Sequence, residues 1–275
     1  MAGTWRIGVC SWSLEPPDAR TLAELARTTG VSAVQLALDP IRLGLMGVEE
    51  VRRSLKDARL VLASGMMAME GEDYSSLRSI RETGGVAPDA TWADNRSAAR
   101  ELARIAKELG IGLISFHPGF LPEDPRQPRW EVVIGRLREL AGIFGERGAQ
   151  VALETGQESL ATLARALEAL SREQVGVNFD PGNLILYGNG DPVAALGALA
   201  PRVIQVHLKD ALPAREEGSW GTEVPIGEGA VDWAAVLGAL RGCPQVTTLV
   251  IERESGSRRV EDVTRAREFL ETVLR

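Results

Sequence analysis

Four side chains that can bind a metal ion each stand at the end of a short apolar run. Glu154 follows Val-Ala-Leu, Asp180 follows Val-Asn-Phe, His207 lies within Gln-Val-His-Leu, and Glu252 follows Leu-Val-Ile. Three carboxylates with one imidazole suit Mn²⁺, Mg²⁺, Co²⁺ or Zn²⁺ and leave coordination positions for a chelating substrate. If the runs are parallel strands of one barrel, their carboxyl ends meet at one mouth. The sequence therefore predicts that the four residues hold one divalent ion.

Each of these residues, taken singly, also has an ordinary structural explanation. Glu154 alone fits an acid at the start of a helix or in a solvated loop. His207 alone fits a hydrogen-bonded histidine in the core. Their occurrence at the ends of successive runs favours a shared metal site over coincidence.

The elements that must position these residues recur as a repeated unit, an apolar run of strand length followed by a stretch of helical periodicity. Many of the runs are apolar at consecutive positions, as in strands buried on both faces of a parallel sheet. Gly30 and Gly110 follow two of the helical stretches and are predicted to end them in the left-handed conformation. The runs span residues 6–10, 33–38, 60–64, 111–116, 150–153, 175–179, 203–208 and 248–251.

Eight such units in 275 residues indicate how the sheet closes. This length is close to the ~250 residues typical of one (β/α)₈ barrel. We predict an α/β fold with a single barrel domain over residues 1–275, and an open doubly wound sheet is the structural alternative.

Two segments interrupt the rhythm and are predicted to shape the barrel mouth. Residues 65–95 contain Gly84, Gly85 and Pro88 and are expected to form a long loop with a short helix near residues 74–83. Residues 211–229, rich in Gly and Pro, follow the seventh run. Loops of such length usually form lids or binding surfaces, so we expect substrate specificity to reside here.

Charge and composition restrict the class of partner. The net charge of −7 provides no general attraction to phosphate backbones, so nucleic acid is not expected to bind. The chain has no signal-peptide pattern and no run of ~18 apolar residues, from which we predict a cytoplasmic protein without a membrane partner. Cys10 and Cys243 lack any metal-ligand spacing and are expected to be reduced thiols that pack in the interior.

The motifs resemble those of the xylose isomerase-like barrel superfamily, which contains sugar and inositol isomerases and epimerases, inosose dehydratases and the type IV apurinic endonucleases. The resemblance covers essentially the whole chain. It rests on Glu154 after Val-Ala-Leu, Asn-Phe-Asp-Pro-Gly-Asn at 178–183, Val-His-Leu-Lys-Asp at 206–210, and Gly-Glu-Gly at 227–229 followed by Trp233 and Glu252.

This resemblance implies one metal ion held by the residues that match its motif, Glu154, Asp180, His207 and Glu252. It also implies that Glu154 and Glu252 transfer protons, as the two glutamates of the family's epimerases do. The chemistry is consistent with this role. A cation that chelates an α-hydroxy ketone acidifies the neighbouring proton, and a carboxylate on each face can remove and return it.

The chain departs from the family pattern at two places. Asn183 stands where many members have a histidine, and an amide cannot take up a proton near neutral pH. Gly-Thr-Glu at 221–223 replaces the Asp-x-His of the endonucleases, and the chain has only two histidines. The three-zinc site of those endonucleases is therefore not expected, and the site is predicted to hold one metal.

Six further residues are predicted to contact substrate, and all but Asn183 have a structural alternative. Lys209 and Asp210 would orient substrate oxygens or form a salt bridge at a strand end. Trp12 would provide an apolar wall for a sugar ring or pack at the rim. His117 would contact substrate or fix the Pro118–Gly119 turn, and Glu158 would reach the site or remain an exposed acid. Asn183 would bind a hydroxyl group.

The leading hypothesis is a metal-dependent isomerase or epimerase of a sugar, polyol or inositol-derived ketone that works through a cis-enediolate. Dehydration of such a ketone on the same site is the alternative. An endonuclease-like phosphodiesterase and a catalytically silent sugar-binding barrel are the less favoured hypotheses. The resemblance also implies a possible homo-oligomer, because dimers and tetramers are common in the family.

Overall fold

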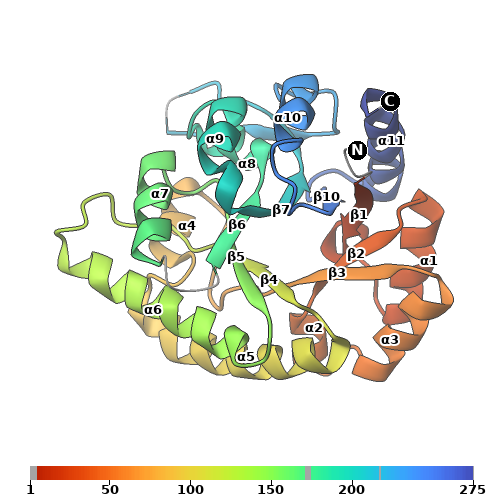
Figure 1. Ribbon diagram of the computed structural model, residues 1–275, viewed down its shortest axis with the longest axis horizontal. Helices are drawn as coiled ribbons and strands as arrows, with labels where there is room; N and C mark the ends of the chain where they lie inside the picture. Colours follow the sequence, from red (N-terminus) through yellow and green to blue (C-terminus); the bar gives the residue numbers. More distant parts are fainter. Residues whose placement is uncertain (1–4, 171–174, 217, 275) are drawn as a thin grey trace.

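The computed structural model describes residues 5–170, 175–216 and 218–274. Its centre is a closed barrel of parallel strands in the order β1-β10-β7-β6-β5-β4-β3-β2, surrounded by helices (Figure 1). These strands are β1 (Arg6–Cys10), β2 (Ala33–Ala37), β3 (Val61–Met66), β4 (Leu113–Phe116), β5 (Gln150–Glu154), β6 (Val175–Phe179), β7 (Val203–Leu208) and β10 (Thr248–Ile251). The (β/α)₈ barrel is confirmed. The pairing of β1 with β10 closes the sheet and excludes the open alternative.

The strand bounds follow the apolar runs closely, with differences of a few residues. β1, β6, β7 and β10 have the predicted limits, whereas β3 extends to Met66 and β5 to Glu154. β4 begins at Leu113, since the preceding Ile111 and Gly112 lie outside the ladder. All five residues of β6 are buried, as expected for a strand covered on both faces.

The helices are α1 (Ala19–Thr29), α2 (Asp39–Arg42), α3 (Val48–Asp57), α4 (Leu77–Thr83), α5 (Asp89–Leu109), α6 (Pro128–Gly145), α7 (Leu160–Ala169), α8 (Pro181–Tyr187), α9 (Pro192–Leu199), α10 (Trp233–Leu240) and α11 (Arg259–Val273). Two short 3-10 helices, η1 (Ser11–Leu14) and η2 (Ala200–Arg202), complete the set. Gly30 and Gly110 end α1 and α5 with φ of 76° and 74°, so the predicted left-handed caps are confirmed. No helix of the described residues is long and apolar enough to cross a membrane.

Both predicted limits of the long loop, residues 65 and 95, are wrong. β3 continues to Met66, and α5 already begins at Asp89 after Pro88. Asn95 is buried within α5, where its Oδ1 accepts a hydrogen bond from the backbone N–H of Glu70 at 2.7 Å. The first turns of the helix therefore dock on the loop. The expected short helix is present as α4, which Ser76 caps by accepting from the N–H of Ser79.

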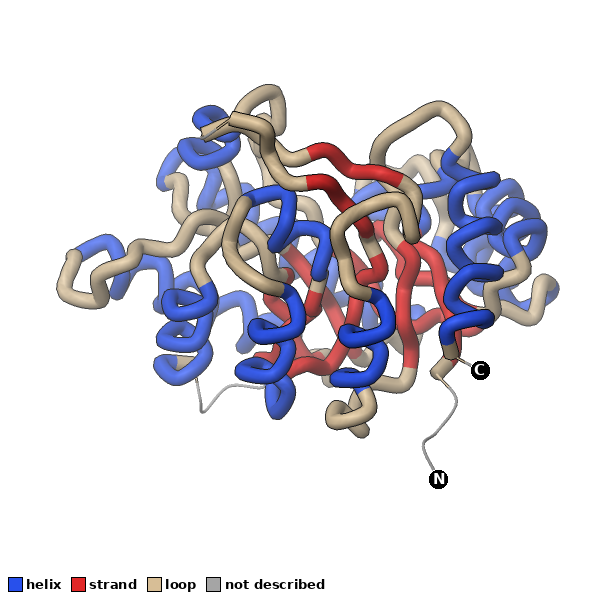
Figure 2. The backbone as a smooth tube through the Cα atoms, turned by 90° about the horizontal axis from the view of Figure 1, so that it is seen from above, coloured by secondary structure: helices blue, strands red, loops and turns tan. Residues whose placement is uncertain are grey.

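The segment of residues 211–229 is more ordered than its composition indicates. An antiparallel pair, β8 (Asp210–Leu212) and β9 (Thr222–Val224), forms within it, and Glu217 lies outside the described residues. Figure 2 shows this pair as two short red segments above the barrel strands. The pair lies close to α8, which follows β6. This segment thus adds a small second layer over the carboxyl end of the barrel.

Candidate metal centre

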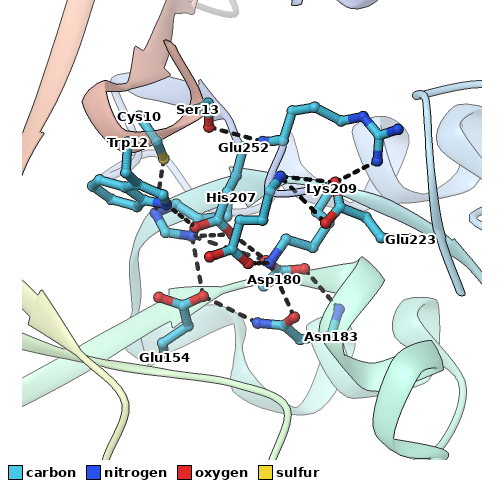
Figure 3. A network of polar contacts seen from close by, with 12 residues as sticks. Cys10, Trp12, Ser13, Glu154, Asp180, Asn183, His207, Lys209, Glu223 and Glu252 are labelled. Carbon is cyan, nitrogen blue, oxygen red and sulfur yellow. Dashed lines mark hydrogen bonds and ion pairs between the residues drawn. The ribbon is translucent and has the colours of Figure 1, made fainter. Parts of the chain in front are cut away.

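The four predicted ligands converge at the carboxyl end of the barrel (Figure 3). Glu154 ends β5, Asp180 follows β6, His207 lies in β7, and Glu252 follows β10. One ligand atom from each lies within 4.8 Å of every other, and all four side chains are buried. The His207 Nδ1 atom is 3.1 Å from Glu154 Oε1 and 3.2 Å from Glu252 Oε2. The convergence expected from the strand ends is present.

The electrostatics of this cluster suit a divalent cation. Burial raises the pKa of Asp180 well above its ordinary range, and the negative charges of Glu252 and Glu154 raise it further, against the opposing effect of the Lys209 ammonium. The Asp180 Oδ2 atom is buried and accepts no hydrogen bond. A buried carboxylate oxygen without a partner is costly unless a cation or a water occupies the adjacent space. The residues present therefore fit a metal ion held by the three carboxylates and His207 Nδ1.

Lys209 provides positive charge within the same cluster. Its ammonium group is buried and lies 2.7 Å from both Glu252 Oε2 and Glu254 Oε2, and 3.8 Å from Asp180 Oδ2. Burial alone would lower the pKa of Lys209, but Glu252 and Glu254 raise it well above its usual value. The side chain is positioned by protein carboxylates, so the salt-bridge alternative is the one observed.

Asp210 has a structural role in place of the predicted substrate contact. Its Oδ2 accepts from the N–H groups of Gly227 and Gly229 and from the Trp233 indole, while Oδ1 accepts from two further backbone N–H groups. A Cβ atom at Gly229 would lie 2.0 Å from Asp210 Oδ1. Both oxygens are thus occupied in fixing the loop before α10, which corrects the prediction.

Trp12 and Asn183 each donate a hydrogen bond to one of the two predicted catalytic glutamates, Glu252 and Glu154. Trp12, in η1, donates its indole N–H to Glu252 Oε1 at 2.8 Å, a polar contact that the prediction of an apolar wall did not include. Asn183, in α8, donates its amide to Glu154 Oε1 at 3.0 Å, and Asn178 donates to the other oxygen at 3.1 Å. Both carboxylates are therefore oriented by neighbouring donors.

His117 and Glu158 have different surroundings. His117 follows β4, and its Nε2 lies 3.5 Å from Glu154 Oε1. Its Nδ1 atom has no hydrogen-bond partner, so the expected alternative in which it fixes the following turn is not supported. Glu158 is buried with neither oxygen hydrogen-bonded, and burial raises its pKa to about 8. The alternative of an exposed acid is wrong for Glu158.

A cavity of about 380 Å³ opens next to the carboxylates and is lined by Trp12, His117, Asn183 and Glu252 among others. Its aromatic wall includes Tyr74, Tyr187 and Trp220, and its further acids are Asp39, Glu72 and Glu254. A larger groove of about 550 Å³ is lined by α1 and α3 and does not include the cluster. The smaller cavity is the candidate substrate site because it adjoins the cluster of predicted ligands through Glu252 and combines polar with aromatic walls.

The sequence did not predict several residues around the site. Cys10 was expected only to pack, but its sulfur lies 3.7 Å from His207 Nε2 and 3.6 Å from Gln35 Oε1. Gln35 accepts a hydrogen bond from His207 Nε2 at 2.6 Å. Their position near the ends of β1 and β2 is the signal that could have identified them. Cys10 and Cys243 are both free and buried, as expected.

Comparison with known proteins decides the family. The model for the xylose isomerase-like TIM barrel matches residues 23–273. The chain belongs to this family. The crystal structure of a xylose isomerase domain protein from Planctomyces limnophilus superposes with a TM-score of 0.88 at 30% identity, covering 98% of each chain. The structure of the 3-keto-D-glucoside 4-epimerase YcjR from E. coli, at 16% identity, covers 98% of this chain and 100% of that one with a TM-score of 0.73, which shows the fold alone.

Curated proteins that are similar in sequence include two with different descriptions. The uncharacterized protein YihM of Escherichia coli is 30% identical over 60% of this chain and 51% of its own, so the match spans about half of YihM. An inosose dehydratase of Geobacillus kaustophilus is 26% identical over 74% of this chain and 71% of its own. The structural and sequence relatives together include sugar epimerases and a dehydratase.

Proposed function

We propose that the protein is a divalent-metal-dependent isomerase or epimerase of a sugar or polyol ketone, with Glu154 and Glu252 as the acid/base pair. The observation that carries this proposal is the position of the two glutamates. They come from β5 and β10, which β6 and β7 separate, and both contact His207 Nδ1. A ketone bound between them would present one face to each carboxylate.

The surrounding residues support proton transfer through a cis-enediolate. When bound, a divalent ion would acidify the proton next to the ketone and offset the negative charge of the enediolate. Glu252, oriented by Trp12 and Lys209, and Glu154, oriented by Asn183 and Asn178, would each remove or return a proton at the carbon they face. Oriented carboxylates need little rearrangement during the reaction.

The cavity favours a neutral substrate over a phosphate ester. The carboxylates that line it would repel a phosphate dianion, and the nearby Lys209 ammonium is engaged by Glu252 and Glu254. The aromatic residues provide flat surfaces for the carbon face of a ring. We therefore infer an unphosphorylated polyhydroxy ketone.

The contacts of Glu223 disfavour phosphodiester hydrolysis. Glu223, at the position where the endonucleases have a zinc ligand, accepts from Arg253 Nη1 at 2.7 Å and from the N–H of Glu254. It is thus engaged outside the cluster of four ligands. This arrangement supports a single metal ion.

Dehydration is the second candidate function, favoured by the similarity to an inosose dehydratase. The same enediolate can expel a hydroxyl group from the next carbon if an acid protonates it. His117 lines the cavity and lies 3.5 Å from Glu154, which places an imidazole where it could serve as that acid. Release of water from an inosose, measured alongside exchange, would separate the two reactions.

The test is solvent deuterium exchange into a panel of ketoses and inososes in the presence of Mn²⁺, followed by NMR. We expect exchange with the wild-type protein and a loss of at least ~100-fold in Glu154→Gln and in Glu252→Gln, since general acid/base catalysis contributes about 10²–10⁴-fold. Glu261→Gln, an exposed change on α11, is the matched control. Exchange that persists in both site variants would contradict the assignment.

The preference for a neutral substrate is tested with matched pairs, a ketose and its phosphate ester. We expect the parent sugar to exchange faster than the ester at equal concentration. Faster exchange of the ester would overturn the inferred substrate class while leaving the proton-transfer proposal intact.

A further inference from the structure

A chain of hydrogen bonds crosses the barrel interior and ends on His207. Ser115 Oγ donates to Met66 Sδ at 3.1 Å, Gln35 Nε2 donates to Ser115 Oγ at 2.6 Å, and His207 Nε2 contacts Gln35 Oε1 at 2.6 Å. The members come from β3, β4, β2 and β7, so distant parts of the sequence build it. Met66 also lines the substrate cavity. We call Met66, Ser115 and Gln35 the relay.

The direction of every hydrogen bond in the relay follows from its Met66 end. A thioether sulfur accepts but cannot donate, so the Ser115 hydroxyl donates to Met66. The Ser115 oxygen then accepts from the amide NH₂ of Gln35, which turns the carbonyl oxygen of Gln35 toward His207. A carbonyl oxygen only accepts, so His207 Nε2 must carry a proton and donate it.

Cys10 is consistent with this direction. Its thiol can donate weakly, and it points to the same Gln35 Oε1 atom at 3.6 Å. Gln35, Ser115 and Cys10 are each 0% exposed, so bulk water does not compete for these contacts. Buried hydrogen bonds of this kind hold side chains in one orientation.

The consequence lies at the other nitrogen of the imidazole. Because Nε2 keeps its proton on the Gln35 carbonyl, only Nδ1 can exchange a proton for a metal ion, and without metal Nδ1 donates to the carboxylates of Glu154 and Glu252 at 3.1 and 3.2 Å. That nitrogen is the one available to a metal. Partners that fix the second nitrogen of a ligating histidine typically change metal affinity by about 10–100-fold.

We propose that Gln35 is a positioning residue that sets the protonation and ring orientation of His207, and that Ser115 and Met66 hold Gln35 in turn. This inference rests on the proposed metal centre. It assigns a role to a side chain that touches neither the cavity nor the predicted ligand carboxylates.

The first test is titration of Mn²⁺ into metal-free protein by calorimetry. We expect Gln35→Leu to weaken binding by about 10–100-fold. Ser115→Ala should weaken it less, because Gln35 keeps its contact with His207. Gln35→Glu retains an acceptor for the Nε2 proton and should restore affinity to near the wild-type value. Ser64→Ala is the matched control, since Ser64 is a buried strand serine whose hydroxyl has no hydrogen bond.

The second test observes the imidazole directly by ¹⁵N NMR with Zn²⁺ bound. The chain has only two histidines, so His117→Asn identifies the His207 signals. We expect a slowly exchanging Nε2 proton in the wild type that is lost in Gln35→Leu and retained in Gln35→Glu. A merely structural role of Gln35 would not produce this pattern.

The outcomes separate the inference from the proposed function. If Gln35→Leu folds, binds Mn²⁺ with unchanged affinity and keeps the slowly exchanging Nε2 proton, then Gln35 does not position His207. If the wild type binds no divalent ion, the proposed metal-dependent function is wrong. The role of Gln35 is then tested by comparing the Nε2 proton of His207 in metal-free wild type and in metal-free Gln35→Leu. If Gln35→Leu does not fold, Ser115→Ala and Gln35→Glu decide by the same measurements.

Discussion

Two buried glutamates at the barrel mouth, Glu252 and Glu158, have opposite charge environments. They are 3% and 5% exposed, so burial does not distinguish them. Glu252 lies 2.7 Å from the Lys209 ammonium and accepts from Trp12, whereas neither oxygen of Glu158 has a hydrogen-bond partner. Burial would raise both pKa values, yet Lys209 and His207 hold that of Glu252 well below its usual range, while that of Glu158 rises to about 8. The partner, and not the depth, decides which acid is ionised.

The largest effect on the charge environment of Glu252 is expected from Lys209→Met, which removes the ammonium group beside it. The acids around it, Glu252, Glu254 and Asp180, then lose their shared cation. We expect the metal-free protein to lose about 3–5 kcal/mol of stability, as when one partner of a buried ion pair is deleted. Calorimetric melting with EDTA and with Mn²⁺ measures this, and the metal should raise the melting temperature more in the variant than in the wild type. An unchanged melting temperature in EDTA would refute the role of Lys209.

Glu158→Gln tests the other side of the contrast through pH. Glu158 keeps its proton in the folded protein up to about pH 8 but loses it near pH 4.5 when unfolded. At this carboxyl group the folded state thus binds more protons in this window, so the contribution of Glu158 to wild-type stability falls as pH rises from about 4.5 to 8.

The amide variant lacks this loss. We expect the free energy of unfolding of Glu158→Gln to equal that of the wild type near pH 4 and to exceed it by on the order of 2 kcal/mol at pH 8. This is less than the full free energy of the pKa shift, because water that reaches the carboxylate reduces the cost of burying its charge. Denaturant melts across this pH range measure the difference. A gap between the two proteins that did not change with pH would exclude the buried, protonated acid.

Trp12→Phe should have the smallest effect, since it removes one neutral donor from Glu252 and leaves Lys209 in place. We expect deuterium exchange to slow about tenfold, which corresponds to the low end of the ~1.5–3 kcal/mol that a hydrogen bond to a charged group contributes. Trp220→Phe makes the same change in another aromatic residue of the cavity and is the control. Equal effects of the two variants would mean that the indole N–H of Trp12 has no special role.

The parts of the site that the sequence predicted depend on local pattern. Glu154, Asp180 and Glu252 end apolar runs, and parallel strands in a barrel place their carboxyl ends at one mouth. Once the eight runs are identified, the meeting of these residues follows from topology. The left-handed ends of α1 and α5 at Gly30 and Gly110 were predictable for the same reason.

The remaining features depend on contacts between distant segments. The burial of Glu158 and the contact of Cys10 with His207 arise only when the barrel closes, and neither residue has a distinctive local pattern. The early start of α5 at Asp89 is stabilised where Asn95 binds the N–H of Glu70, 25 residues away. Asp210 could not be assigned because its partners lie on a loop whose conformation the sequence does not determine.

The Asp210 anchor has a consequence for engineering of the cavity rim. Asp210 holds Gly227, Gly229 and Trp233, and any side chain at position 229 would collide with its carboxylate. The peptide that joins it to Lys209 links this loop to the ammonium beside Glu252. A loop transplanted from a relative to alter specificity must therefore include the residues equivalent to both Asp210 and Gly229. Exchange of either one alone would displace the loop and, through the neighbouring Lys209, the ammonium group beside Glu252.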